Sequence, residues 1–116
     1  SNDMKRAKPF YDAVLATLGY KCLGDYGDTA GYGKDFPEFW VGKPHDGGKA
    51  APGNGTHVCF NADRREQVDN FHAKAVEMGG KDDGKPGLRP EYTPDYYAAF
   101  VRDPDGNKIE AVCFVK

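Results

Sequence analysis

The stretch that decides the fold is the C-terminal segment YYAAFVRDPDGNKIEAVCF, residues 96–114. Two runs rich in β-forming residues flank the segment 103–107, DPDGN, in which Pro presets a turn and Gly or Asn accepts positive φ. The pattern therefore predicts an antiparallel hairpin. In its second strand, alternation places Glu110 on the face opposite to Ile109 and Ala111.

Glu110 is the residue around which a function is expected. It shares its face with Val112 and Phe114, which are apolar. A carboxylate among apolar residues is costly if it is left unpaired, so Glu110 should face water, a cation or a metal ion.

Composition narrows the class of protein. The 116 residues suit one domain, and 39% hydrophobic residues indicate a globular chain. A net charge of −2 without a basic run argues against nucleic acid or an anionic membrane as a partner. No long apolar run and no signal-like segment is present, so a soluble cytoplasmic protein is expected. The isolated cysteines Cys22, Cys59 and Cys113 are expected to be buried reduced thiols.

The first half of the chain predicts one helix and three strands. Apolar residues recur at helical spacing over residues 3–18, until Gly19. Pro9 predicts a loose or kinked first turn, with the regular helix beginning near Lys8. The expected strands and the Gly- and Pro-rich connector after them are residues 20–26, 29–33, 38–42 and 43–55.

The second half predicts a strand at residues 56–61 and then a second helix. Asp63 with Glu66 three residues later is typical of a capping box, and the apolar pattern stops at Gly79. Residues 81–95 contain several Gly and Pro, so we expect a long surface loop there, with at most a short strand near its start.

The two halves form a repeat. An offset of 61 residues places Phe10 on Phe71 and Gly19 on Gly80. The second half reads strand, helix, three strands, whereas the first half has no strand before its helix. We therefore expect the sequence to begin after the opening strand of its first half.

Three side chains of metal-ligand type fall on comparable faces of the predicted strands. His57 lies on the face turned away from the following helix, and Glu38 shares a face of its strand with Trp40. His57, Glu110 and Glu38 could converge in one cup. Imidazole and carboxylate donors suit Zn, Ni, Mn or Fe(II).

At this point the sequence resembles a known family. The segments THVCF at 56–60, PEFW at 37–40 and FVRDPDGNKIEAV at 100–112, in paired modules, resemble the vicinal oxygen chelate superfamily. This group includes glyoxalase I, bleomycin and fosfomycin resistance proteins and extradiol dioxygenases. The resemblance covers nearly the whole chain, and GLRPEYTPDYYAAFV at 87–101 resembles the small bacterial glyoxalase-like members.

The resemblance implies an α+β fold. Two βαβββ modules would form a curved, mostly antiparallel sheet around a cup, with the helices outside. The chain would be a single domain over residues 1–116, with a first module at 1–45 that lacks its opening strand and a second at 56–116. Small members commonly dimerise, so a homodimer is expected.

The resemblance also implies roles for individual residues. His57, Glu110 and Glu38 match metal ligands of the family, and the base role falls to Glu110. Glu38 could equally be a solvated residue at the start of its strand, without a metal role. We further expect the hairpin to pair the small Ala99 with Glu110, which would leave space beside the carboxylate.

Trp40, Arg89 and Tyr97 are the expected substrate-binding residues. Trp40 could equally be a core residue, and Arg89 and Tyr97 could equally serve to pack the loop.

The leading functional hypothesis is a metal-dependent enzyme of the isomerase or lyase type, which acts on a small oxygenated substrate by metal chelation and proton transfer. One alternative is a metal-free small-molecule or drug-binding protein of the bleomycin-resistance kind. Another is an Fe(II) enzyme of the extradiol dioxygenase kind. All three would place a small molecule in the same cup.

Overall fold

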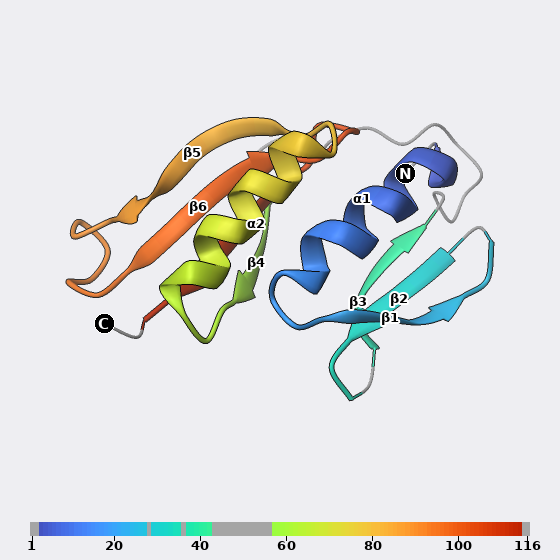
Figure 1. Cartoon of the computed structure of the whole chain (residues 1–116), viewed down its shortest axis with the longest axis horizontal. Helices are drawn as coiled ribbons and strands as arrows, with labels where there is room; N and C mark the ends of the chain where they lie inside the picture. The colour runs from blue at the N-terminus through green and yellow to red at the C-terminus, as the bar shows by residue number, and fades with distance from the viewer. Residues whose placement is uncertain (1–2, 28, 36, 43–56, 115–116) are drawn as a thin grey trace.

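The structure is a computed structural model, and it describes residues 3–27, 29–35, 37–42 and 57–114, without the side chains of Pro37 and His57. Figure 1 shows two helix-and-strand units side by side. In chain order the elements are α1 (Met4–Ala16), β1 (Lys21–Asp25), β2 (Thr29–Gly33), β3 (Pro37–Gly42), β4 (His57–Asn61), α2 (Arg65–Glu77), β5 (Lys81–Leu88), β6 (Tyr97–Arg102) and β7 (Lys108–Cys113).

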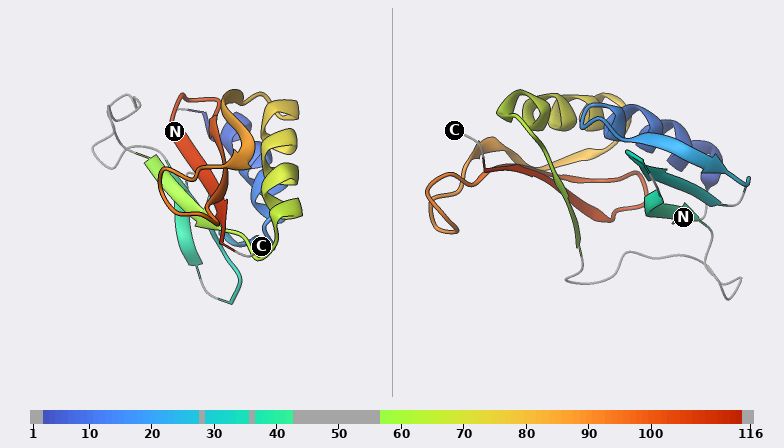
Figure 2. Two further views of the ribbon diagram at one scale, coloured as in Figure 1. Left: turned by 90° about the vertical axis from the view of Figure 1, so that its left-hand side faces the viewer. Right: turned by 90° about the horizontal axis from the view of Figure 1, so that it is seen from below.

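The strands form two sheets. The first has the order β1-β2-β3 and is antiparallel, and the second has the order β4-β7-β6-β5. In the second sheet β4 and β7 are parallel, and the other pairs are antiparallel. Both helices lie on the same side of the strands (Figure 2). The predicted α+β fold of βαβββ modules is confirmed, and the first module has no opening strand among the described residues.

Helix α1 begins earlier and more regularly than the sequence predicts. The Asp3 carboxylate accepts the backbone N–H of Arg6 at 3.2 Å, and the helix then runs through Pro9. The expectation of a regular helix only from Lys8 is therefore wrong. Pro9 removes one N–H that would have bonded the carbonyl of Lys5, and Lys5 is exposed, so water can hydrate that carbonyl.

The N-cap of helix α2 lies one residue after the predicted cap, Asp63. Arg64 is the N-cap residue, and the Oε1 atom of Gln67 accepts the backbone N–H groups of Asp63 and Arg64 at 2.7 and 3.1 Å. Gln67 therefore takes the part that the sequence pattern assigns to Glu66. It satisfies N–H groups that have no partner within the helix.

Residues 81–88 form the strand β5, so the predicted long loop is wrong over this stretch. The pairing of β5 with β6 shifts register on both sides of Gly84, which has φ 157°. Pro86 is tolerated because β5 is an end strand of its sheet, where one row of N–H groups has no neighbour to bond. Gly and Pro here mark bulges in an edge strand, not its absence.

The predicted C-terminal hairpin is confirmed. Its turn is built on Asp103, whose Oδ1 atom accepts the N–H groups of Asp105 and Asn107 at 3.0 and 2.8 Å. Gly106 takes φ 92°, which favours glycine at that position. Gly106 therefore takes the positive φ that the sequence pattern predicts.

The two units share one hydrophobic core. The apolar faces of α1 and α2 pack on the strands, and the largest fully buried side chains include Phe10, Leu15, Tyr32, Phe71 and Ile109. Within the described part of the chain, neither helix is long and apolar enough to cross a membrane.

Candidate functional site

The candidate site lies on the face of the second sheet that is turned away from α2, called the open face below. Ile109 belongs to the core beneath α2, so the alternation along β7 puts Glu110 on the open face. Cys59 of β4 pairs with Glu110 on one side, and Phe100 of β6 pairs with it on the other. Cys59, Glu110 and Phe100 therefore form a row across three neighbouring strands.

The register of the hairpin corrects the sequence prediction. Phe100, not Ala99, lies opposite Glu110, and Ala99 pairs with Ala111. The space beside the carboxylate is thus bordered by an aromatic residue. The register differs by one residue, and such a shift exchanges the two faces of a strand.

Glu110 is buried and hydrogen-bonded. The residue is only 2% exposed, and the Tyr96 hydroxyl donates to its Oε2 atom at 2.5 Å. The Cys59 thiol is a second hydrogen-bond donor to Glu110. The Tyr96 ring is in turn held edge-on by Tyr92 and Phe114, with centroids 4.9 and 5.3 Å away. A buried carboxylate held by two donors is positioned, not merely tolerated.

Both donors keep their protons at neutral pH. Burial, and then the charge and hydrogen bond of Glu110, raise the pKa of the Cys59 thiol to about 12. Cys59 as a whole residue is exposed, so this burial concerns the sulfur beside Glu110 and not the residue's full surface. Burial and the hydrogen bond to Glu110 also raise the pKa of Tyr96 above its ordinary value. A thiol and a phenol that stay protonated can only donate to the carboxylate.

The backbone places position 57 close to this row. In the parallel pairing of β4 with β7, His57 lies opposite Lys108, two residues before the pair Cys59 and Glu110. Positions 57 and 110 are therefore diagonal neighbours on one face of the sheet. The side chain of His57 lies outside the described part of the structure. Its assignment as a metal ligand therefore stays a prediction.

The structure describes only some of the side chains that were predicted to bind a metal ion. Among the side chains that the structure describes, no group of three or more His, Cys, Asp and Glu lies close enough to hold a metal ion. The Glu110 carboxylate and an imidazole at the diagonal position 57 would be an oxygen and nitrogen donor set. Such a set fits Zn, Ni, Mn or Fe, so the chemistry of these residues is compatible with the metal.

Glu38 lies on β3, in the first sheet, and its side chain is exposed. Tyr20 lies close enough to Glu38 to be affected by its charge. Burial is the largest cause of the raised pKa of Tyr20, and the charge of Glu38 is the next. The metal role of Glu38 stays a prediction.

Trp40 forms an exposed aromatic surface on β3 of the first sheet. It is 51% exposed, and its ring stacks on that of Tyr26 with centroids 6.4 Å apart and planes 21° apart. The indole lies over Gly31, where a Cβ atom would come within 2.8 Å of it. Trp40 is therefore not a core residue, and its placement suits contact with a ligand.

The other two predicted substrate residues have partners of their own. The Arg89 guanidinium donates to the carbonyls of Gly87 and Lys85 at 2.9 and 2.8 Å. Tyr97 donates its hydroxyl to Asp69 of α2 at 2.6 Å, on the face opposite to Glu110. These contacts favour the packing role that the sequence left open for both residues.

The first of two structural features that the sequence did not indicate is the pair of donors to Glu110. Alternation put Cys59 on the right face, but only the register of β4 against β7 shows that its thiol meets Glu110. Tyr96 precedes β6, where no periodic pattern applies. The second feature is the raised pKa of Tyr20, to which burial contributes most and the charge of Glu38 next.

Comparison with known protein families gives a match over most of the chain. A family model described as the Glyoxalase/Bleomycin resistance protein/Dioxygenase superfamily matches residues 1–111. No curated protein sequence matches the chain significantly.

Solved structures are also similar to the chain. A glyoxalase/bleomycin resistance protein from Albidiferax ferrireducens T118 is 38% identical with a TM-score of 0.84, over 97% of this chain and 90% of that one. A lactoylglutathione lyase from Agrobacterium tumefaciens has 22% identity and a TM-score of 0.63, over 97% of this chain and 87% of that one. The second likeness is one of fold alone. By its family match and by its relative at 38% identity, the chain belongs to the glyoxalase/bleomycin resistance protein/dioxygenase superfamily.

Proposed function

We propose that the protein is a metal-dependent enzyme in which Glu110 moves a proton at a carbon next to a carbonyl group of a small oxygenated substrate. The observation that carries this proposal is the buried carboxylate of Glu110, fixed on the open face by the Tyr96 hydroxyl and the Cys59 thiol. Carboxylates with partners of this kind are typical of general acid and base catalysis.

His57, Glu110 and Glu38 are the residues that would hold the metal ion. When bound, a divalent cation stabilises the negative charge that develops on a carbonyl oxygen as the neighbouring carbon loses its proton. Glu110 accepts that proton and returns it to the adjacent carbon. Tyr96 and Cys59, which remain protonated, orient the carboxylate during both steps. Trp40 would offer an aromatic wall to the substrate.

Proton exchange in deuterated water tests the reaction directly. α-Hydroxycarbonyl and 2-oxoaldehyde adducts, including the glutathione adducts suggested by the lactoylglutathione lyase relative, would be followed by proton NMR with the metal-loaded protein. We expect exchange at the carbon beside the carbonyl, and its loss in Glu110→Gln. Glu77→Gln is the matched control, because Glu77 is exposed on α2 and forms an ion pair with Lys74 of the same helix at 3.0 Å.

A calorimetric titration with Zn²⁺, Ni²⁺ or Mn²⁺ tests the metal part separately. We expect affinity to fall at least tenfold in His57→Ala and in Glu110→Gln and to be unchanged in Glu77→Gln. An unaltered protein that binds none of these ions would contradict the proposal.

A metal-free binding protein is the second candidate, favoured by the exposed stack of Trp40 on Tyr26, which are 51% and 71% exposed. Such a pair suits a planar aromatic ligand. In that case Glu110→Gln would leave ligand affinity nearly intact, and Trp40→Ala would abolish it. Quenching of the Trp40 fluorescence by aromatic ligands distinguishes the two candidates.

A further inference from the structure

A cluster of positive charge lies on the open face beside Glu110. It is centred on Phe100, which pairs with Glu110 in the hairpin and therefore lies on the same face. The Lys108 ammonium nitrogen is 5.1 Å from the centre of the Phe100 ring, and the guanidinium carbon of Arg89 is 5.5 Å from it. Two cations thus flank an aromatic ring that lies one strand away from the carboxylate of the proposed chemistry.

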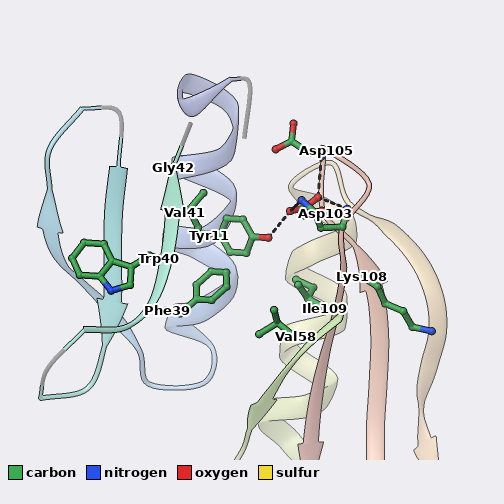
Figure 3. A pocket seen from close by; sticks show the side chains of 11 residues that line it. Tyr11, Phe39, Trp40, Val41, Gly42, Val58, Asp103, Asp105, Lys108 and Ile109 are labelled. Carbon is green, nitrogen blue, oxygen red and sulfur yellow. Dashed lines mark hydrogen bonds between the residues drawn. The ribbon is translucent and has the colours of Figure 1, made fainter. Parts of the chain in front are cut away.

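The backbone explains why these side chains meet. Lys108 lies two residues before Glu110 on β7, so alternation puts both on the open face, about 7 Å apart along the strand. In Figure 3 the side chains of Lys108 and Ile109 extend to opposite sides of β7. The Phe100 ring lies over Gly84 of β5, where a Cβ atom would come within 2.8 Å of it. The glycine therefore lets the ring lie close to the sheet, within reach of both cations.

The positive charge of this cluster is only partly balanced. The Asp83 carboxylate lies 3.8 Å from the Lys108 ammonium, but it is shared with Arg102, whose Nε atom is nearer at 3.2 Å. Arg89 donates to two backbone carbonyl groups and forms no ion pair within the described part of the chain. Those contacts pack the guanidinium without neutralising its charge. Asp83 is thus one carboxylate among three cations.

The Glu110 carboxylate takes its hydrogen bonds from the other direction. Its donor Tyr96 lies near the far end of β7, because the next residue along the chain pairs with Cys113. Its other donor, Cys59, lies on β4. Lys108 is the first residue of β7. A substrate at Glu110 would therefore have the donors of that carboxylate on one side and the cations on the other.

We propose that Lys108, supported by the charge of Arg89, binds an anionic group of the substrate over Phe100. This inference rests on the proposed function, because it assigns the anion to the molecule on which Glu110 acts. Residues paired across antiparallel strands have Cα atoms about 5 Å apart, so the anion would lie only a few bonds from the reacting carbon. The substrate class is therefore a small carbonyl compound that carries a carboxylate or a phosphate group. Lysine and arginine bind both groups.

Titration of the metal-free protein with simple anions tests the site apart from any reaction. Inorganic phosphate and acetate represent the two kinds of group, and backbone amide NMR shifts follow their binding. We expect saturable shifts at Phe100 and Lys108, with affinity that falls as the ionic strength rises. The anion that binds more tightly identifies the group carried by the substrate. Shifts confined to other parts of the chain, or no saturable shift, would overturn the proposal.

A matched pair of lysine variants locates the binding. Lys108→Gln should weaken anion binding about fivefold or more, because it removes the charge nearest to the ring. Lys74→Gln should leave binding unchanged. The Lys74 side chain is 38% exposed against 34% for Lys108 and also faces a carboxylate, that of Glu77, but it lies on α2. Equal losses in both variants would overturn the proposal, since binding would then follow only the net charge of the protein.

Substitution of Asp83 gives a result that a folding defect cannot imitate. Asp83→Asn removes the carboxylate that Lys108 and Arg102 share, so anion binding should become about threefold tighter. Asp69→Asn removes the same charge from an exposed position on α2 and should not change the affinity. Weaker binding in Asp83→Asn would contradict the proposed site.

Steady-state kinetics of proton exchange separate this inference from the proposed function. With a substrate that carries the favoured anion, Lys108→Gln should raise KM about fivefold or more and leave kcat nearly unchanged. With the neutral ester of that substrate, it should change neither. Equal KM values for anion and ester in the unaltered protein would overturn the anion site and leave the activity of Glu110 intact. Anion binding without any exchange would overturn the enzymatic function and leave the anion site.

Discussion

The Tyr96 hydroxyl donates a hydrogen bond to the Oε2 atom of Glu110 at 2.5 Å. The two residues lie on the two arms of the C-terminal hairpin, and Glu110 is 2% exposed. Tyr96 immediately precedes β6, so the phenol reaches across the open face to the carboxylate. This contact connects the hairpin, which determines the fold, with the residue that carries the proposed chemistry.

Removal of this hydroxyl should weaken both the fold and the activity. Tyr96→Phe deprives a buried carboxylate of a donor, and hydrogen bonds to charged groups contribute about 1.5 to 3 kcal/mol. We expect the free energy of unfolding to decrease by an amount in that range. We also expect kcat to decrease by a larger factor than KM changes. Urea titration and steady-state kinetics measure the two effects.

The neighbouring tyrosine provides the control. Tyr97 also donates to a carboxylate, that of Asp69 at 2.6 Å, but this contact is exposed and lies on the helix side. Tyr97→Phe should therefore cost less than about 1 kcal/mol and leave kcat unchanged. Equal effects of the two substitutions on kcat would remove Tyr96 from the site.

The Cys59 thiol should react slowly with alkylating reagents. Its pKa is raised from 9.0 to about 12, so little thiolate is present at pH 8. In metal-free buffer we expect iodoacetamide to modify Cys59 at least tenfold more slowly than an ordinary exposed thiol, although Cys59 is exposed. Mass spectrometry of digested protein separates it from Cys22 and Cys113.

Substitution of Glu110 should move this reactivity to lower pH. Glu110→Gln removes the charge that disfavours the thiolate, whereas burial, the largest cause of the raised pKa, remains. The rate against pH should therefore shift only part of the way toward that of a free thiol. An unchanged profile would show that Glu110 does not act on the Cys59 sulfur.

The fold could be predicted well from the sequence because the periodic patterns of helices and strands are local and recur in both halves of the chain. Alternation alone placed Glu110 on the correct face of β7, and helical spacing located α1 and α2. The prediction failed at residues 81–88, because the Gly and Pro residues of this edge strand resemble those of a loop.

The site was harder to predict because it depends on contacts between distant strands. The pairing of Phe100 with Glu110, one residue away from the expected Ala99, is set by the turn geometry at Asp103 and Gly106. The phenol of Tyr96 has no periodic signal at all. Which residue types gather on one face can be predicted, whereas which donor meets which acceptor requires the register.

Substitution of Gly31 should displace the Trp40 ring. A Cβ atom at position 31 would lie 2.8 Å from the indole, so Gly31→Ala forces Trp40 away from its stack on Tyr26. Trp40 is the only tryptophan of the chain, so its fluorescence reports this movement directly. We expect a shifted emission maximum with unchanged far-ultraviolet circular dichroism. An unaltered spectrum would mean that the indole does not lie over Gly31 in solution.

Tyr11 and Asp103 join the two units and should make the protein sensitive to alkali. The buried Tyr11 hydroxyl donates to Oδ2 of Asp103 at 2.5 Å, and burial, followed by the charge of Asp103, raises the pKa of Tyr11. Above its ordinary value of 10.0, an unfolded tyrosine loses its proton while the folded one keeps it. The folded state then binds more protons, so stability falls as pH rises above about 10.

A double-mutant cycle measures this connection. Tyr11→Phe should lower the free energy of unfolding at pH 7 by about 1 to 3 kcal/mol, because it leaves a buried carboxylate without one donor. Asp103→Ala should cost more, since Asp103 also accepts from the backbone of Asp105 and Asn107. The two losses should not add, because residues in contact share their interaction energy. Between pH 9 and 11, Tyr11→Phe should lose stability less steeply than the unaltered protein, since it has one fewer phenol to ionise on unfolding. Additive losses together with identical pH profiles would show that the hydroxyl and the carboxylate do not interact in solution.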